Sequence, residues 1–239
     1  MIKITNLQIE LNSIIAAYNA LVKGIDEAAL DNRDRAYGGI IRAGKGKLVE
    51  SIARQLVRSA WCTVLNQPGS RLTMDKTKFR IRLKDDYINR MKEPYVKNYL
   101  VKNKSTIAYK FGTDVHVYID GRLVIPIECK AYTENAMMKR ILFDAALMQE
   151  AKGINKYYLL QLESQLGGDY CELNDITYGS PSTHTLISYF DVDLKIITLL
   201  KGERKVDQPI HKPEYYKPLT LQRLEWAANM LAADLKQFT

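Results

Sequence analysis

Residues 112–130 constrain the fold of this chain more than any other stretch. Two apolar runs rich in β-branched residues meet there at Asp120-Gly121. Asp-Gly between two such runs is one of the strongest short-range signals for a β-hairpin. The first run follows Asp114, and the second ends in Glu128-Cys129-Lys130. The sequence therefore predicts a hairpin of buried composition with charged residues at its open end.

Those charged residues form a candidate site if they meet. Alternation along a strand places Glu128 and Lys130 on the same face. With Asp114 beside them, two carboxylates and an ammonium would converge, which suits a divalent metal and an attacking water. The alternative is an ordinary amphipathic hairpin whose Glu and Lys form a solvated pair. The apolar setting favours the site, because charges at the end of a buried strand usually have a specific role.

The pairing register decides between these interpretations. With a two-residue turn at Asp120-Gly121, Asp114 falls opposite the residue before Glu128 and faces away. One extra residue in the turn pairs Ile119 with Leu123 and sets Asp114 opposite Glu128. We expect this bulged register.

Length and composition indicate one soluble globular domain over residues 1–239. The chain is 46% hydrophobic and 26% charged, and no apolar run approaches the length of a membrane span. The amino terminus lacks the apolar core of a signal peptide. Cys62, Cys129 and Cys171 are too few and too scattered for a disulfide framework or a zinc cluster. We therefore expect a protein of the reducing cytoplasm, with no membrane association.

The positive charge is concentrated in one segment. The formal net charge is +8, and residues 75–110 carry eight lysines and three arginines against four acids. Aromatic and Asn residues are interleaved with these cations. This pattern indicates a polyanionic partner, most plausibly nucleic acid, although a solvated charged surface would look similar.

The order of elements predicts an α/β protein with helices around a mixed sheet. Residues 1–36 form an added helical element, with one helix at about 6–30 or two broken near Gly24. The core covers about residues 45–200, and a last helix covers about 219–238. The other expected helices are at 45–61, 85–102 and 135–152, with strands at 79–83, 157–162, 185–190 and 194–200, a strand starting within 62–65, and a loop at 33–46.

Two other motifs carry less weight. Gly39 to Lys45 matches a phosphate-binding loop through its lysine, but Gly46 and Lys47 stand where a metal-binding Ser or Thr hydroxyl is required. We therefore expect no nucleotide cofactor. The histidines His116, His184 and His211 lack ligand spacing. His116 alternates in phase with Asp114, so it either faces the site or is a satisfied strand histidine.

A helix carboxylate could join the site. Glu50 lies on the polar side of the helix expected at 45–61, beside its buried stripe. It could approach the same metal as Asp114 and Glu128. The alternative is a solvated helix glutamate.

Thr113-Asp114, the hydrophobic strand pair and Ile127-Glu128-Cys129-Lys130 resemble the signature of the PD-(D/E)XK nuclease superfamily. Gly46 to Glu50 is similar to its leading helix, and the resemblance covers roughly residues 45–165. Thr113 stands where the motif has proline, a variable position. A single domain of this length looks most like a type II restriction endonuclease.

This resemblance implies a restriction-endonuclease-like core, a central mixed β-sheet flanked by helices, with helices added at both termini. It implies a homodimer that uses Mg²⁺ to cut double-stranded DNA at a short, palindromic sequence. Asp114, Glu128 and the Cys129 carbonyl would bind the metal. Lys130 would serve the attacking water, and Glu50 is a further candidate.

DNA recognition requires phosphate contacts and base contacts. The candidates for phosphate contact are basic residues of the charged segment and of the helix after the hairpin: Arg80, Arg82, Lys84, Lys97, Lys102, Lys104, Lys139 and Arg140. The candidates for base contact lie in the polar segment 167–184: Asn174, Tyr178, Ser180, Ser182 and Thr183. That segment could also be an ordinary surface loop.

Two further functions remain open from the sequence. One is a structure-specific nuclease, such as a junction resolvase or repair enzyme. The other is a non-catalytic DNA-binding protein whose Asp, Glu and Lys form a structural salt bridge. The amino-terminal helix is either a dimer interface or part of the core.

Overall fold

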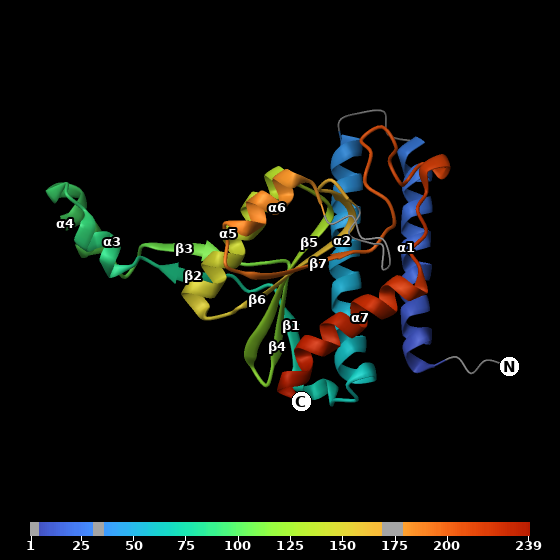
Figure 1. Ribbon diagram of the computed structural model, residues 1–239, viewed down its shortest axis with the longest axis horizontal. Coiled ribbons are helices and arrows are strands. Elements are labelled where there is room, and N and C mark those ends of the chain that lie inside the picture. The colour runs from blue at the N-terminus through green and yellow to red at the C-terminus, as the bar shows by residue number, and fades with distance from the viewer. Residues whose placement is uncertain (1–4, 31–35, 169–178) are drawn as a thin grey trace.

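A five-stranded mixed β-sheet with helices on both faces forms the body of the protein (Figure 1). The computed structural model describes residues 5–30, 36–168 and 179–239, with the side chains of 25–43 left out of the description. The expected α/β architecture is confirmed. Within the described part of the chain, no helix combines the length and the apolar character needed to cross a bilayer.

The sheet has the strand order β1-β4-β5-β6-β7. The first three strands pair antiparallel, and β5, β6 and β7 pair parallel. The long strand β5 is therefore central and joins the two halves. The bounds are β1 Leu72–Asp75, β4 Val115–Ile119, β5 Arg122–Glu134, β6 Lys156–Gln165 and β7 Asp193–Thr198.

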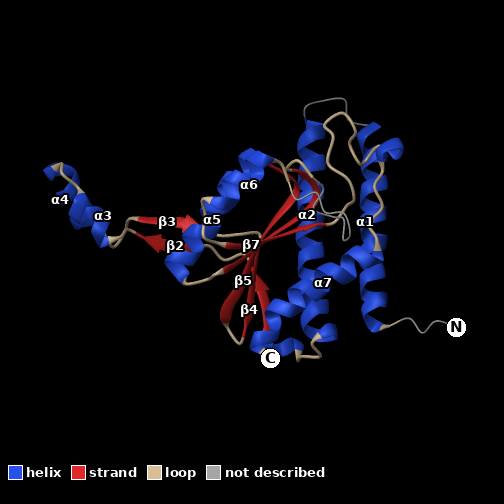
Figure 2. Cartoon of the chain, in the orientation of Figure 1, coloured by secondary structure: helices blue, strands red, loops and turns tan. Residues whose placement is uncertain are grey.

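Alternate residues of each strand pack into two separate cores. Val115, Val117, Ile127 and Cys129 point toward α1, α2 and α7, as does Tyr158 of β6. On the other face, residues such as Tyr157 and Leu159 pack against α5. Figure 2 shows these layers, with α1, α2 and α7 on one side of the sheet and α5 on the other. The helix bounds are α1 Asn6–Leu30, α2 Ala36–Arg58, α5 Asn135–Lys152, α6 Pro181–Ser188 and α7 Leu221–Leu235.

The hairpin contains the expected extra residue, but in the strand and not in the turn. Asp120 and Gly121 have φ of 50° and 76°, so they form a two-residue turn with both residues left-handed. Ile119 therefore pairs with Arg122, and the predicted pairing of Ile119 with Leu123 is wrong.

The register then shifts between Val117 and Tyr118, where Val124 is the unpaired residue of a β-bulge. Beyond the bulge Val115 pairs with Ile127, so the ladder leads Asp114 to a place opposite Glu128. A bulge in the strand gives the same offset as a longer turn.

Four expected segments differ from the structure, and one of them is the helix expected at 85–102, which is interrupted at residues 91–93. Helix α2 begins at Ala36, not after a loop ending near Gly46, because a helix nucleated by its buried part extends at little cost. Cys62 to Val64 lie in a π-helical turn, Ser59–Val64, not in a strand, since the buried stripe of α2 continues through Ala60 and Trp61. The strand expected at 185–190 is helix α6, and β1 was not expected at all.

The ends of the chain are helical, as predicted. Helix α1 is unbroken, and its Leu11, Ile14, Tyr18 and Val22 are buried against the body. The apolar arc of α1 is therefore core within one chain. Helix α7 lies across the same face of the sheet (Figure 1).

A basic extension leaves the body between β1 and β4, at the left of Figure 1. It consists of strands β2 and β3, which pair with each other and not with the main sheet, and of two short helices at its tip. We call this extension the arm, residues 79–111. Its elements are β2 Phe79–Arg82, α3 Asp85–Arg90, α4 Pro94–Asn103 and β3 Ala108–Phe111.

Candidate active site

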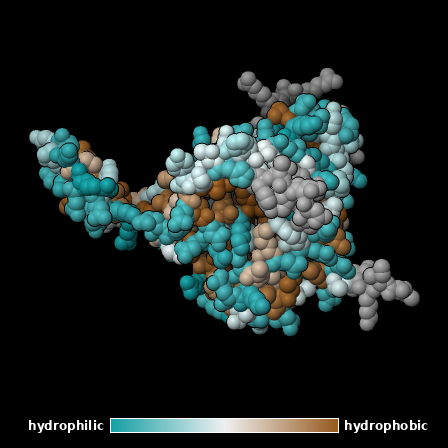
Figure 3. Space-filling view, viewed as in Figure 1, coloured by the Kyte–Doolittle hydropathy of each residue, from teal (hydrophilic) through white to brown (hydrophobic). Residues whose placement is uncertain are grey.

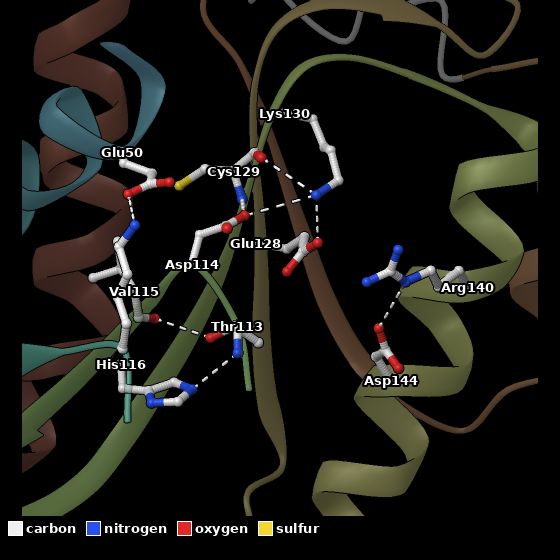
Figure 4. A network of polar contacts seen from close by, with 11 residues as sticks. Glu50, Thr113, Asp114, Val115, His116, Glu128, Cys129, Lys130, Arg140 and Asp144 are labelled. Atoms are coloured by element: carbon white, nitrogen blue, oxygen red, sulfur yellow. Dashed lines mark hydrogen bonds and ion pairs between the residues drawn. The ribbon is translucent and has the colours of Figure 1, made fainter. Parts of the chain in front are cut away.

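Asp114, Glu128 and Lys130 meet at the open end of the hairpin (Figure 4). Lys130 Nζ forms an ion pair with Glu128 Oε1 and lies 3.7 Å from Asp114 Oδ2. The backbone N–H of Cys129 donates a hydrogen bond of 2.8 Å to Asp114 Oδ2. Two carboxylates and one ammonium thus share a small volume next to a backbone carbonyl, that of Cys129.

The alternation of β5 produces this arrangement. Cys129 points into the core beside α2, so its neighbours Glu128 and Lys130 point to the α5 side of the sheet. Asp114 directly precedes β4, where regular pairing ends and the backbone can turn its carboxylate toward β5. The side chains of Asp114 and Lys130 are about one third exposed, so solvent and ligands can reach them.

Burial dominates the electrostatics of Glu128. Its side chain is 8% exposed, and burial raises the pKa of its carboxyl, with the nearby charge of Asp114 acting in the same direction and Lys130 opposing both. Burial also raises the pKa of the Cys129 thiol, and the charges of Asp114, Glu128 and Glu50 add to this effect. A thiol kept neutral in this way is not a nucleophile, so the site offers oxygen ligands and one cation.

These groups fit a hard divalent cation. The Asp114 and Glu128 carboxylates and the Cys129 carbonyl are the oxygen ligands that Mg²⁺ prefers, and Mg²⁺ commonly keeps several waters. Within the residues that the structure describes, no group of three or more His, Cys, Asp or Glu side chains could hold a metal. A metal here would therefore need water or substrate oxygens to complete its shell.

Glu50 approaches from the opposite side. It projects from α2, on the face of the sheet that Cys129 faces, and it forms an ion pair with Lys76. The Glu50 carboxylate lies beside the Cys129 side chain in Figure 4, and its charge adds to the raised pKa of the Cys129 thiol. Glu50 is thus close to the site but separated from Glu128 by the strand.

The sequence left open whether His116 faces the site or is an ordinary strand histidine. In the structure His116 is fully buried and contacts the backbone just before Asp114. Its Nε2 accepts a 3.0 Å hydrogen bond from the backbone N–H of Thr113, so Nδ1 carries the proton of the neutral ring. Nδ1 lies 3.3 Å from Asp75 Oδ1, and the ring stacks on Phe79 at 4.7 Å. Burial lowers the pKa of His116, which keeps the ring neutral and able to accept this bond.

Asp144 is a neighbour that the sequence analysis missed. It lies on α5 facing the site, mostly buried, with its Oδ2 3.6 Å from Arg140 Nε. Burial raises the pKa of the Asp144 carboxyl, and Arg140 opposes the effect. A charged residue among the buried positions Ile141, Leu142 and Ala145 was the available signal.

The residues expected to contact phosphate lie at two places. Lys139 and Arg140 are exposed on α5 near its start, next to the site. The others lie on the arm or at its strand ends, where Lys84 pairs with Glu150 and Lys104 pairs with Asp85. This second group is Arg80, Arg82, Lys84, Lys97, Lys102 and Lys104.

The structure describes only the two ends of the segment 167–184 that was expected to contact bases. Asn174 and Tyr178 lie outside the described residues. Ser180 caps α6 by accepting from the Thr183 N–H, and Ser182 is exposed on that helix. Thr183 is fully buried, with its hydroxyl bonded to Leu166 O and Asn135 Oδ1, so in the free protein its side chain faces the interior and its contact with a base stays a prediction.

Comparison with known proteins assigns the family. No family model matches the chain. A solved structure described as the native BbvCI A2B2 tetramer aligns with a TM-score of 0.35 and 10% identity over 95% of this chain and 88% of that one. The type II restriction enzyme DdeI of Desulfomicrobium norvegicum is 44% identical over 232 residues, which are 95% of this chain and 97% of that protein. The chain therefore belongs to the family of the type II restriction enzyme DdeI and is a restriction endonuclease.

Proposed function

We propose that this endonuclease hydrolyses phosphodiester bonds of double-stranded DNA with Mg²⁺, at the site formed by Asp114, Glu128 and Lys130. The observation that carries the proposal is the convergence of the two carboxylates and the ammonium at the end of the hairpin. The relationship to DdeI supports the same reaction class.

In this proposal Asp114 and Glu128, with the Cys129 carbonyl, would hold the metal. The Cys129 N–H fixes the rotamer of Asp114, so the metal-binding oxygens are positioned before substrate arrives. Bound Mg²⁺ would supply Lewis-acid polarisation of the phosphate and acidification of a bound water.

Lys130 acts on the attacking water. Its ammonium lies between the two carboxylates, within reach of any water held there. It orients that water and offsets the negative charge that develops on the phosphate in the transition state. Arg140 is exposed beside the site and is available to a phosphate oxygen.

We further propose that the enzyme works as a homodimer on a short palindrome, in the cytoplasm. Two active sites related by two-fold symmetry match the symmetry of a palindromic duplex. Cys62 and Cys129 are free thiols, which agrees with a reducing compartment. Sedimentation equilibrium tests the dimer, with an expected mass of twice 27.4 kDa.

The test of catalysis is digestion of phage DNA with Mg²⁺, which should give discrete bands. Asp114→Ala and Lys130→Ala should each lower the cleavage rate by about 10²–10⁴-fold or more. Both variants should still bind duplex DNA in gel-shift assays without metal. Asp207→Ala and Lys236→Ala change the same residue types at exposed positions away from the site and should cut normally.

Retained cutting by either site variant contradicts the assignment of the residues. Wild-type protein that binds DNA but leaves it intact with Mg²⁺ points instead to a binding protein with a structural salt bridge.

A further inference from the structure

The arm carries most of the excess positive charge of the molecule. Residues 79–111 contain nine Lys and Arg against three Asp and Glu, a net charge of +6, whereas the whole chain has +8. A short extension therefore presents a concentrated positive field, while the rest of the protein is nearly neutral. Such a field attracts polyanions and repels a second copy of the same extension.

The arm buries very little of itself. Along α3 and α4, Ile88 is the one buried side chain, and Tyr95 and Tyr99 are 86% and 61% exposed. Figure 3 shows the tip standing clear of the body with a mainly hydrophilic surface. An extension that buries so little apolar surface contributes little to the stability of the fold. We therefore look for its role in binding a partner.

The strand pair of the arm has two different faces. Phe79, Ile81 and Phe111 pack on the core beneath α5. On the other face Arg80 lies directly opposite Lys110, with Arg82 two residues along the strand from Arg80.

Like charges directly opposite each other destabilise a strand pair. Within the described residues, none of these three cations has a carboxylate partner, and Arg80 donates only to the carbonyl of Thr106. The basic face therefore lacks its counter-anion in the protein alone.

The arm joins the body next to the proposed catalytic carboxylate. Strand β3 ends at Phe111, three residues before Asp114. Strands β2 and β3 pair over four residues each. With a rise of about 3.4 Å per residue, the strand pair is about 14 Å long, which is the length of about four base pairs of duplex. The basic face thus lies close in the chain to the site and has the length of about four base pairs.

From these observations we propose that the arm is a clamp for the phosphate backbone of duplex DNA flanking the cleaved step, with Arg80, Arg82 and Lys110 as its phosphate contacts. This inference rests on the proposed function, since it assumes that DNA occupies the site at Asp114. The tip extends the same contact along the duplex, and the exposed tyrosines supply donors and flat apolar surface beside the phosphates.

The test measures binding of a random-sequence duplex without divalent metal, so that neither cleavage nor the recognition sequence enters. The variant Arg80→Gln/Lys110→Gln removes the like-charge pair, so its melting temperature should equal or exceed that of the wild type. Each lost phosphate contact lowers the slope of log affinity against log salt by about 0.9. The loss of affinity between about 50 and 200 mM salt should therefore be about tenfold smaller in the double variant.

The matched control is Arg58→Gln/Lys236→Gln, which removes the same two charges from exposed positions on the body. Because no phosphate contact is lost in this control, its slope of log affinity against log salt should equal that of the wild type within experimental error. Equal slopes for the control and the arm variant overturn the proposal. An unchanged slope with a change in sedimenting mass also overturns it, because the arm would then be a contact between protein chains.

A second variant keeps the proposal testable if the first fails to fold. Lys97→Gln/Lys102→Gln lies on α4, far from the two cores, and should also lower the salt slope. A wild-type protein that binds duplex through the arm but never cuts it would leave this inference standing and overturn the proposed function. An arm variant that still cuts DNA, and whose binding has the same salt dependence as the wild type, would overturn this inference and leave the proposed function standing.

Discussion

At the scale of single residues, the site depends on backbone hydrogen bonds as much as on its charged side chains. Asp114 is held by the Cys129 N–H, and the turn before it is held by His116, which accepts from the Thr113 N–H. His116 is fully buried, and its other nitrogen lies near Asp75 on β1. The orientation of one proposed catalytic carboxylate therefore depends on a histidine that faces no solvent.

Replacing that histidine tests the dependence. His116→Phe keeps a ring on Phe79 but leaves the buried Thr113 N–H without an acceptor, a change that costs about 1–3 kcal/mol of folding free energy. Urea unfolding should show this loss, and the cleavage rate should fall in conditions where the variant remains folded. His184→Ala, at an exposed position of α6, is the control and should change neither quantity. Normal cleavage by folded His116→Phe would show that the turn keeps its shape without the bond.

The buried carboxyl of Asp144 offers a second residue-scale prediction. Asp144→Asn keeps the size of the side chain and removes the charge that pairs with Arg140. We expect Arg140 to be freed toward the site, so that DNA binding strengthens modestly, by less than about tenfold. Competition gel shifts against the wild type measure this, and weaker binding by the variant would contradict it.

At the scale of elements, a buried carboxylate of α7 contacts two strands of the parallel half of the sheet. The Asp234 carboxylate forms ion pairs with Lys156 and Lys195, each with a nitrogen–oxygen distance of 2.8 Å. It also accepts a hydrogen bond of 2.6 Å from the hydroxyl of Tyr158. Burial alone would raise the pKa of Asp234, but the hydrogen bonds from Lys156, Lys195 and Tyr158 outweigh burial and lower it. The contact therefore stabilises the fold in its ionised form.

This gives a pH dependence with a definite sign. A carboxyl with a lowered folded pKa contributes stability above its unfolded pKa of about 3.9 and loses it as pH falls through the folded value. Asp234→Asn should lower the free energy of unfolding by about 1–3 kcal/mol at pH 7, and the difference from the wild type should shrink below about pH 4. Thermal unfolding across pH measures it, with Asp207→Asn as an exposed control. A difference that stays constant down to low pH would contradict the assignment.

Helix α6 supplies a smaller prediction. Its N-cap Ser180 accepts from the Thr183 N–H, and Pro181 occupies the first helical position. Ser180→Ala should destabilise the protein by about 1 kcal/mol, whereas Ser182→Ala, on the exposed surface of the same helix, should have little effect. Chemical unfolding of the two variants compares them directly, and equal midpoints would contradict the role of the cap.

The same helix shows why some elements escaped prediction. Thr185 to Phe190 has strand-like composition, and the deciding signal was Ser-Pro just upstream, which starts a helix. In the same way, Cys62 to Val64 is too short an apolar run to distinguish a strand from the end of a buried helix. The long periodic segments were predictable, including α5 with both of its ends, because burial and helical period agree there.

The pairing offset that sets Asp114 opposite Glu128 was predicted, but the position of the extra residue in the hairpin was not. Asp-Gly specifies a two-residue turn, and that local rule holds. The extra residue sits at Val124, inside an apolar run where nothing local distinguishes one residue from the next. The convergence of Asp114 with Glu128 could therefore be expected from the chemistry of the ends, while the position of the bulge depends on packing of both strands with the rest of the sheet.

At the scale of the whole molecule, one part buries much less apolar surface than the rest. The body has two cores, one on each face of the sheet, and the arm has little core of its own. Local opening is easiest where few apolar contacts are buried. The arm should therefore be the first region to yield to a protease.

Trypsin tests this because the arm is rich in lysine and arginine. The earliest cuts should fall between Lys84 and Lys104, and duplex DNA should slow them several-fold if the arm holds the backbone. Mass spectrometry of the first fragments, with and without DNA, gives both results. First cuts in the body, or cuts in the arm at an unchanged rate with DNA, would contradict these expectations.

The strand pair at the base of the arm has a topological consequence. Phe79 and Phe111 are paired neighbours, so the chain leaves the body and returns to it at one point. The intervening 83–107 is thus an insertion whose ends are already closed by a hairpin. This module can therefore be shortened to a tight turn without moving Asp114, and such a variant should retain the proposed cutting centre while losing the proposed contact of the tip with the duplex.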